Sequence, residues 1–149
     1  MKKNMTEMIG LASDHAGYEM KETLIKWLKE NGLKVMDFGC YNPEPCDYPD
    51  FAHSLARAVA DGTCGMGISL CGSGNGINMV VNKYPSIRSA LCWNEEISAL
   101  ARAHNDANIC AIPARFIPVE LAVRIVKVFL ETPFDGGRHM RRINKIPVS

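Results

Sequence analysis

The sequence predicts one α/β domain in which helices cover a parallel β-sheet. Short apolar runs alternate along the chain with longer amphipathic stretches, which is the pattern of strands joined by helical crossovers. The length of 149 residues suits a single domain, and 47% hydrophobic with 22% charged residues is an ordinary globular balance. Because no repeat, low-complexity tract or linker divides the chain, we expect residues 1–149 to fold as one unit, with residues 132–149 as a polar, basic tail.

Five apolar runs predict the strands of this sheet, and the stretches between them predict the helices. The expected strands are residues 8–12, 33–38, 66–70, 87–92 and 107–112. The expected helices are residues 18–30, about 49–60, 77–82, a helix capped by Asn94 that ends near His104, and a last helix at 119–131. Asn31 and Gly32 supply a stop signal for the first helix, and Pro118 opens the last one.

Apolar residues at helical spacing indicate which helix faces should be buried. The predicted stripes are Met20, Leu24, Trp27 and Leu28 in the first helix, Ile97, Leu100, Ala101 and His104 in the fourth, and Leu121, Ile125, Val128 and Phe129 in the last. His104 ends its stripe, so the residues alone leave two interpretations open. It is either a histidine that interacts with the helix C-terminus or a functional group.

Charge and cysteine usage exclude several classes of protein. A net charge of +1 gives no reason to expect a nucleic acid or an anionic membrane as partner, and no apolar run approaches the roughly 18 residues of a membrane span. Residues 1–7 hold two lysines but no apolar segment, so they do not resemble a secretory signal. The six cysteines lack a Cys-x-x-Cys spacing, which argues against zinc, and we expect reduced thiols in a cytoplasmic protein.

Ligands of a parallel sheet collect beyond the carboxyl ends of its strands, and four polar features fall there. They are residues 13–15, 71–76, 93–94 and 114–115, which follow the first, third, fourth and fifth predicted strands. A fifth feature, His104-Asn105-Asp106, ends a helix and would therefore lie at the opposite edge of the sheet. It can join the other four only if a neighbouring subunit brings it there.

The loop Gly72-Ser73-Gly74-Asn75-Gly76 follows a strand and leads into a helix. Its glycines permit positive φ and close backbone approach, so successive N–H groups can converge on an oxyanion or a phosphate. It is neither a Walker loop nor the Gly-x-Gly-x-x-Gly dinucleotide fingerprint. From the residues alone, a tight strand–helix turn without a ligand is an equally good interpretation.

Cys71 stands at the end of the strand before this loop, where converging amides and a helix N-terminus favour a thiolate. Such a thiolate can accept a carbon-bound proton while the amides hold the developing oxyanion; the alternative is a buried structural thiol. Ser73 is either a further donor to that oxyanion or a turn hydroxyl. Asp14 and His15 are either site residues or a turn that caps the first helix.

The basic run at residues 138–142 is the remaining candidate. A run of charges is usually a solvated surface, but arginines also make planar, bidentate contacts with phosphate. If the run is helical, Arg138 and Arg142 share one face while Arg141 is turned away.

Taken together, six motifs resemble those of the type B ribose-5-phosphate isomerases, a group that also includes allose-6-phosphate and galactose-6-phosphate isomerases. The motifs are SDHAGY at 13–18, DYP at 47–49, CGSGNG at 71–76, NK at 82–83, HNDAN at 104–108 and GGRH at 136–139. The resemblance implies a Rossmann-like three-layer αβα sandwich that forms a homodimer or a dimer of dimers with shared active sites. It also implies conversion of a small sugar phosphate between aldose and ketose through an enediolate, with no metal and no cofactor.

The resemblance assigns a role to each candidate residue. Cys71 matches the proton-transfer base of one branch of the family, and the other branch has a glutamate at the position of Ile77. His104 matches the residue that opens the sugar ring with help from Asp14, and Ser73 matches a group that stabilises the enediolate. The matches to substrate-binding positions are Tyr48 near the sugar, the loop residues Gly72, Gly74, Asn75 and Gly76, Asn105 on hydroxyl groups, and His15, Arg115, Arg138 and Arg142 around the phosphate.

The activity implied is interconversion of ribose 5-phosphate and ribulose 5-phosphate, in the non-oxidative branch of the pentose phosphate pathway. A six-carbon substrate such as allose 6-phosphate or galactose 6-phosphate is the nearest alternative, since one more carbon needs only a modestly longer pocket. A non-catalytic phosphate-binding module is a more distant alternative, because it would need the loop and the arginines but neither Cys71 nor His104. The lack of a Cys-x-x-Cys motif disfavours a thiol redox protein.

Overall fold

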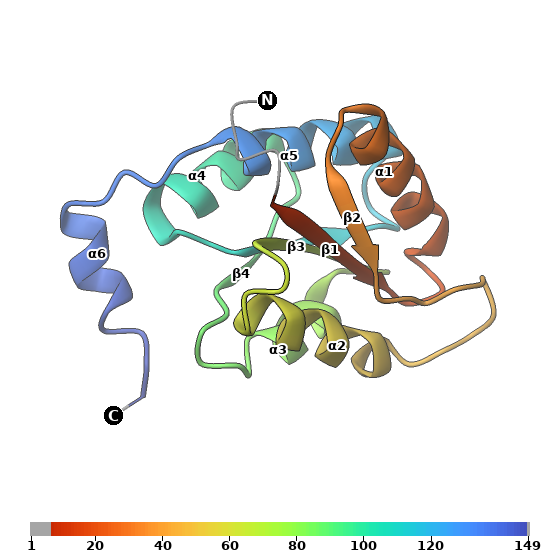
Figure 1. The fold of residues 1–149 in the computed structure, drawn as a ribbon, viewed down its shortest axis with the longest axis horizontal. Coiled ribbons are helices and arrows are strands. Elements are labelled where there is room, and N and C mark those ends of the chain that lie inside the picture. The colour runs from red at the N-terminus through yellow and green to blue at the C-terminus, as the bar shows by residue number, and fades with distance from the viewer. Residues whose placement is uncertain (1–6, 149) are drawn as a thin grey trace.

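The computed structural model describes residues 7–148, so residues 1–6 and 149, at the two ends of the predicted domain, lie outside the described residues. The described part of the chain forms one five-stranded sheet in the order β2-β1-β3-β5-β4, and every pairing is parallel (Figure 1). Its strands are β1 (Met8–Ser13), β2 (Lys34–Asp37), β3 (Met66–Cys71), β4 (Ser89–Leu91) and β5 (Ile109–Pro113). The predicted parallel sheet is confirmed.

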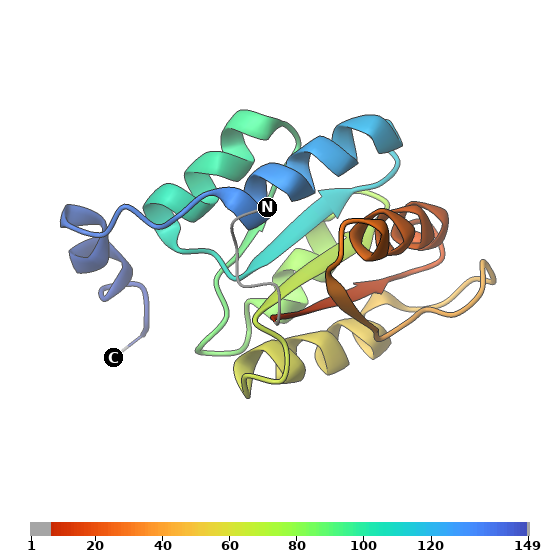
Figure 2. The ribbon, with the colours of Figure 1, turned by 45° about the horizontal axis from the view of Figure 1, so that its top comes forward.

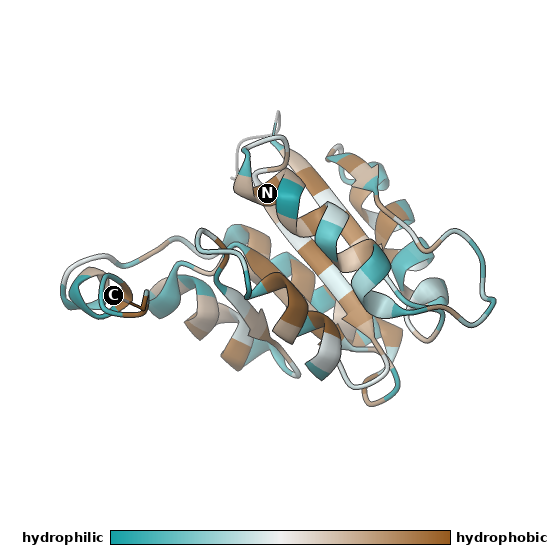
Figure 3. Ribbon diagram, turned by 90° about the horizontal axis from the view of Figure 1, so that it is seen from below, coloured by the Kyte–Doolittle hydropathy of each residue, from teal (hydrophilic) through white to brown (hydrophobic). Residues whose placement is uncertain are grey.

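Helices cover both faces of this sheet, which gives the three layers expected of the fold. The helices of the described residues are α1 (Tyr18–Glu30), α2 (Tyr48–Ala60), α3 (Asn75–Val81), α4 (Glu95–Asn105), α5 (Val119–Glu131) and α6 (Arg138–Ile143). One cluster of buried apolar side chains joins the sheet to α1, α4 and α5, and a second joins its other face to α2 and α3. Figure 2 shows these two groups of helices on opposite sides of the sheet. The central strands β3 and β5 are buried along their whole length, as strands covered on both faces must be. Figure 3 shows hydrophobic residues, in brown, recurring along the strands of the sheet.

The bounds of all five strands and of helices α2 and α3 differ from the prediction by one or two residues. The edge strands β2 and β4 are shorter than their apolar runs, because each pairs with only one neighbouring strand and only the paired residues belong to the sheet. Helix α3 begins at Asn75 instead of residue 77, since Gly74 adopts a φ of 76° and forms its N-cap. Helices α1 and α5 have the predicted bounds, and Asn94 caps α4 through its side chain, as predicted.

Helix α5 is not the last helix, as the sequence had indicated, because α6 lies within the predicted tail. Figures 1 and 2 both show α6 at the end of an extended connection, away from the sheet and beside the end of α4. Gly136 and Gly137 precede it with φ values of 69° and 58° and redirect the chain at this point. Within the described residues, no helix is long and apolar enough to cross a membrane.

The buried helix faces are rotated from the predicted stripes, and in α1 and α4 polar residues take core positions. In α1, Lys21 is completely buried while Met20 and Trp27 are only half-buried. In α4, Ser98 and Arg102 are buried, whereas Leu100 is exposed and His104 half-buried. In α5 the buried residues include Ala122, Val126 and Leu130, and the predicted Leu121 and Val128 lie partly exposed.

Ser98 and Arg102 both have hydrogen-bond partners, which the pattern of apolar residues in α4 does not indicate. The Ser98 hydroxyl donates to the Ile125 carbonyl oxygen at 2.9 Å and so joins α4 to α5. Arg102 donates to the Ala107 carbonyl oxygen at 2.6 Å and to Asp106 at 2.9 Å. Burying a polar side chain costs little when its hydrogen bonds are made, which explains why the stripes fail here.

Candidate functional site

The strand order creates a switch point between β1 and β3. The chain leaves β1 toward α1 on one face of the sheet and leaves β3 toward α3 on the other face, so the loops after these neighbouring strands diverge. In open α/β sheets such a divergence forms the crevice in which ligands bind. The sequence features 13–15 and 71–76 therefore lie on the two sides of this crevice.

Cys71 is the last residue of β3 and is buried against the second apolar cluster. Its carbonyl oxygen accepts a hydrogen bond from the Ala114 N–H at 3.0 Å, which fixes the strand end against the segment after β5. The thiol is thus held at the base of the loop by two paired strands, as the sequence predicted. A buried sulfur at this position can act only on a ligand that enters the crevice.

The loop after Cys71 is built as a tight turn into α3. The Ser73 Oγ accepts a hydrogen bond from the Asn75 N–H at 3.2 Å, so the turn-hydroxyl interpretation is confirmed and the side chain itself remains exposed. At Gly74 a Cβ would lie 3.1 Å from the backbone of Ile112 and 2.5 Å from the Leu91 side chain. Only glycine fits here, because the positive φ and the close approach both exclude a side chain.

Two side chains from other elements lie on the glycine loop. The Arg115 guanidinium lies over Gly72, where a Cβ would come within 3.2 Å of Nη1, and the Arg115 N–H donates to the Gly72 carbonyl oxygen at 3.0 Å. The Tyr48 ring lies over Gly76, where a Cβ would come within 2.7 Å of the phenol oxygen. The loop is thereby flanked by a positive charge and a hydroxyl group.

Asp14 and His15 form the opposite side of the crevice. The Asp14 Oδ1 accepts a hydrogen bond from the Gly17 N–H at 3.1 Å, so the carboxylate does cap the turn that starts α1. The Asp14 N–H donates to the Leu70 carbonyl oxygen at 3.2 Å, which ties this turn to β3 next to Cys71. The His15 Nδ1 accepts from the Cys46 N–H at 3.2 Å, so a neutral His15 carries its proton on Nε2 and can donate it to an anion.

The remaining candidates lie at the other end of the molecule. His104 and Asn105 end α4, and Arg138 and Arg142 share a face of α6, beside the end of α4. Figures 1 and 2 show that this region and the loop that precedes α2 are at opposite ends of the sheet. One chain therefore brings together ten predicted site residues and leaves four apart. The ten are Asp14, His15, Tyr48, Cys71, Gly72, Ser73, Gly74, Asn75, Gly76 and Arg115.

A hollow of about 610 Å³ also lies at the far end, away from Cys71. Its lining includes Asn105, the start of β4 and the apolar side chains of Ile146 and Val148. The lining supplies neither a thiol nor the glycine loop, so we place the chemistry at the switch point and regard this hollow as a surface feature of the His104 end.

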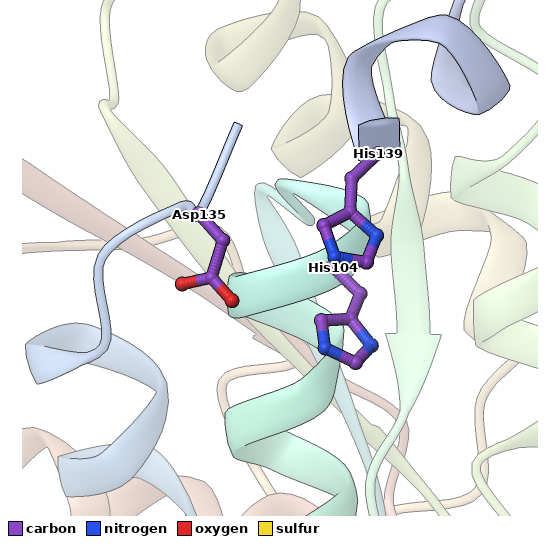
Figure 4. A group of neighbouring side chains, drawn as sticks. All are labelled: His104, Asp135 and His139. Carbon is purple, nitrogen blue, oxygen red and sulfur yellow. The ribbon is translucent and has the colours of Figure 1, made fainter. Parts of the chain in front are cut away.

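Three groups near these sites were missed by the sequence reasoning. His139 stacks on His104 with ring centroids 4.2 Å apart, and Asp135 lies beside both rings (Figure 4). Burial lowers the pKa of His139, and the neighbouring His104 and Arg138 lower it further. The motif GGRH pointed to Arg138, but nothing in its spacing indicated that the next residue would fold back onto α4.

The third missed group is Lys21 of α1, which binds the end of β2 and, through Gly39, the end of β1 beside the crevice. Its ammonium group donates to both carboxylate oxygens of Asp37, at 2.8 and 2.9 Å, and Asp37 Oδ1 also accepts from the Gly39 N–H at 2.9 Å. Gly39 in turn accepts from the Ser13 N–H at 2.7 Å. A lysine within the apolar pattern of α1 was the available signal.

All six cysteines of the described residues are free thiols, and all but Cys46 are buried. Burial, together with the neighbouring thiol of Cys40, raises the pKa of Cys46 to about 11. Burial likewise raises the pKa of Cys64 to about 11. These thiols are poorer nucleophiles at neutral pH than an ordinary cysteine.

A doubly wound α/β fold with a glycine loop at its switch point defines a class of ligand-binding domain and enzyme. Within this class the chain belongs to the ribose/galactose isomerase family, whose profile matches residues 9–146. The chain is similar to ribose-5-phosphate isomerase B of Escherichia coli strain K12, with 38% identity over 138 residues and 93% of each chain covered. It is 41% identical to the probable ribose-5-phosphate isomerase B of Mycoplasma pneumoniae over 143 residues, 95% of this chain and 94% of that one.

Solved structures that are similar to this chain are also ribose-5-phosphate isomerases B. Ribose-5-phosphate isomerase B of Clostridium thermocellum superposes with a TM-score of 0.92 at 45% identity, covering 93% of this chain and 94% of that chain. The Mycoplasma genitalium enzyme, solved with bound ribulose-5-phosphate, gives a TM-score of 0.92 at 39% identity, covering 96% and 95%. The predicted family and fold are confirmed.

Proposed function

We propose that this chain interconverts ribose 5-phosphate and ribulose 5-phosphate, with Cys71 as the base that moves the proton. The observation that carries the proposal is the position of Cys71, fixed at the end of β3 directly before a loop of glycine amides that Arg115 flanks. Relatives named ribose-5-phosphate isomerase B along nearly the whole chain support the substrate class. A non-catalytic phosphate-binding module would not need a thiol at this place.

The phosphate of the substrate would be anchored by positive and N–H groups. Arg115 and the Nε2–H of His15 supply two such donors at the Cys71 end, and Arg138 and Arg142 supply two more from another subunit. Anchoring the phosphate positions the far end of the sugar, so binding energy is converted into alignment of the reacting carbons.

The reaction would begin with opening of the furanose ring by His104, which moves a proton from the anomeric hydroxyl to the ring oxygen, with Asp14 and Tyr48 holding the sugar. The Cys71 thiolate then takes the proton from C2. The electron pair of that C–H bond forms the C1–C2 double bond, and the carbonyl pair moves to O1, giving an enediolate. Return of the proton from Cys71 to C1 and transfer of the O2 hydrogen to O1 complete ribulose 5-phosphate.

The negative charge on the enediolate oxygens would be offset by donors of the loop. The N–H groups after Gly72 and the Ser73 hydroxyl are suited to this, with Asn105 of another subunit on the remaining hydroxyl groups. Each well-placed donor is worth about 3–4 kcal/mol at the transition state. Because the backbone already holds these donors in place, no free energy is needed to reorient them during the reaction.

The base assignment is tested by Cys71→Ala, with Cys64→Ala as a control in the same buried cluster. In a coupled assay on ribose 5-phosphate with EDTA present, we expect kcat of Cys71→Ala to fall about 10²–10⁴-fold and Cys64→Ala to stay near wild type. Binding of ribitol 5-phosphate, which lacks the carbonyl, should survive in both variants. Turnover by Cys71→Ala near the wild-type rate would refute the base, and loss of all turnover with EDTA would refute the metal-free mechanism.

We also propose that the active site is shared between subunits of a homodimer or a dimer of dimers. The two groups of proposed site residues lie at opposite ends of the folded molecule. Near His104, exposed apolar side chains are present that a partner subunit would cover. Leu100 is 37% exposed and Met140 is 43% exposed. Exposed apolar side chains grouped beside polar site residues are typical of a subunit interface.

Mixing two inactive variants tests the shared site. In a heterodimer of Cys71→Ala with His104→Asn, one of the two sites keeps both an intact thiol and an intact imidazole. After random exchange of subunits, we expect recovery of roughly a quarter of the wild-type activity. No recovery, with heterodimers demonstrated by mass spectrometry, would place both residues' functions within one chain and overturn the arrangement.

The six-carbon alternative has support from the family itself, which includes galactose isomerases. Comparing kcat/KM for ribose 5-phosphate, allose 6-phosphate and galactose 6-phosphate decides between them, and a preference for a six-carbon sugar would replace the proposed substrate. Six unpaired thiols suit a reducing compartment, so we place the activity in the cytoplasm.

A further inference from the structure

Within one chain, His104, Asp135 and His139 form a compact group at the end of the molecule away from Cys71. One potential ligand atom from each lies within 4.8 Å of the others, and Figure 4 shows the two imidazoles one above the other with the carboxylate at their side. The three residues come from the end of α4, the connection after α5, and the start of α6. The proposed isomerase mechanism uses only His104 of the three.

The backbone holds this group together independently of the side chains. The Asp135 N–H donates to the Ala103 carbonyl oxygen at 2.9 Å, so Asp135 is fixed next to His104. Gly136 and Gly137, both with positive φ, then turn the chain, and the His139 N–H donates to the Gly136 carbonyl oxygen at 3.2 Å. This turn places a buried His139 ring on the half-buried His104 ring.

We propose that His104, Asp135 and His139 form a binding site for a divalent transition-metal ion of the zinc type. Two imidazole nitrogens and one carboxylate oxygen are a donor set that such ions prefer, whereas magnesium and calcium prefer oxygen ligands alone. Three protein ligands leave a coordination position open for water. The ion would be a ligand of the protein and not a participant in the isomerase mechanism.

The observed side chains need a limited rearrangement to bind the ion. The rings are stacked with only 12° between their planes, and a metal must lie in the plane of each ring that binds it. Donor atoms on one tetrahedral ion lie about 3.4 Å apart when each bond is about 2.1 Å. Rotation of the half-buried His104 and the exposed Asp135 can supply this change while the buried His139 stays in place.

Metal binding has a functional consequence that rests on the proposed function. An ion on His104 occupies the nitrogen lone pair that ring opening requires, so the ion would inhibit isomerisation. The positive charges of the arginines at 138, 141 and 142 repel a metal cation nearby, and the negative charge of Asp135 offsets part of this repulsion. The site is therefore suited to reversible binding of a metal in excess and not to permanent retention.

The four histidines of the chain allow a direct test of the site. The imidazole nitrogens of the whole protein are followed by ¹H–¹⁵N NMR during titration with Zn²⁺ under a phosphine reductant. We expect the signals of His104 and His139 to shift together, while that of His53, a histidine paired with Tyr84, stays unchanged. Uniform shifts of all four histidines, or none at His104 and His139, would overturn the proposal.

Variants separate this site from binding by cysteine thiols. His139→Gln and Asp135→Asn should each weaken Zn²⁺ binding about tenfold or more, whereas His53→Gln, at a histidine paired with Tyr84, should not. Asp135 is exposed, so its variant tests the site even if His139→Gln fails to fold. Unchanged Zn²⁺ affinity in Asp135→Asn and in folded His139→Gln would show thiol binding and refute the site.

A separate isomerase assay tests whether the bound metal inhibits the reaction. We expect Zn²⁺ to inhibit the wild-type isomerase reversibly, and inhibition of Asp135→Asn to need about tenfold more metal. Equal inhibition of both proteins would show that zinc acts through Cys71 and would overturn the inhibitory role. The NMR titration does not depend on turnover, so a failed isomerase assay and a failed metal site remain distinguishable.

Discussion

Replacing Asp37 with asparagine removes one charge from an ion pair whose lysine is completely buried. The Lys21 side chain is 0% exposed and the Asp37 side chain 30% exposed, with Nζ 2.8 Å from Oδ1. Breaking a buried pair by removing one partner costs about 3–5 kcal/mol, because the other charge stays desolvated. The partial exposure of Asp37 and the second partner Glu22, 3.0 Å from Nζ, reduce this, so we expect a loss of about 2–3 kcal/mol in the free energy of unfolding.

The matched control lies on the same helix. Lys26 and Glu30 form an ion pair at 3.8 Å with side chains 81% and 61% exposed, and exposed pairs contribute at most about 0.5 kcal/mol. Urea unfolding followed by circular dichroism, at equal protein concentration, should therefore separate Asp37→Asn clearly from Glu30→Gln. Equal and small losses in the two variants would refute the reasoning from burial.

The same pair gives a pH dependence of known sign. Burial alone lowers the pKa of Lys21, but the hydrogen bonds and charges of Asp37 and Glu22 outweigh it, so the pKa is raised above 10.5. The pair's contribution is therefore complete below pH 10.5 and is lost as pH rises through the higher pKa of the folded state. The difference in stability between wild type and Asp37→Asn should shrink above that pH, and a difference that grows would contradict the assignment.

Two further predictions concern the rim of the crevice. Gly76→Ala would place a Cβ 2.7 Å from the Tyr48 oxygen, so the ring must leave the loop; kcat/KM on ribose 5-phosphate should fall about tenfold or more, and an unchanged value would mean that Tyr48 does not contact substrate. Cys46, with a pKa of about 11, should react with iodoacetamide at pH 8 about 100-fold more slowly than an ordinary thiol, despite its partial exposure. Peptide mapping by mass spectrometry measures this rate, and labelling as fast as in the urea-unfolded chain would contradict the raised pKa.

Much of the Cys71 end was predictable from the chain alone. Alternating apolar and amphipathic stretches predict a parallel sheet, and a parallel sheet sends the ends of all its strands to one edge. Cys71, the glycine loop, Asp14 and Arg115 each lie at the end of a strand or within a few residues after it, so their convergence required no knowledge of side-chain packing. The bounds of α1 and α5 were also predictable, because Gly32 and Pro118 are local signals that act on their own residues.

The burial of Lys21 and Arg102 was not predictable, because the partners of each include a group that is distant in sequence. Lys21 is neutralised by Asp37 of another element, and Arg102 reaches the Thr132 carbonyl oxygen beyond the next helix. Hydrophobic periodicity predicts that a charged residue is exposed. Its burial becomes favourable only when the tertiary fold brings a partner group close to it.

The sequence by itself determined the sheet, the order of its helices, and the position of Cys71 at the edge where ligands bind, because these depend on periodicity and local turn signals. The tertiary structure alone decided where the second group of residues lies. Helix α6 is too short to be recognised from periodicity, and its place depends on a two-glycine turn and on packing against α4. The stack of His139 on His104 is consequently a property of the folded chain, since neither residue constrains the other until distant segments have met.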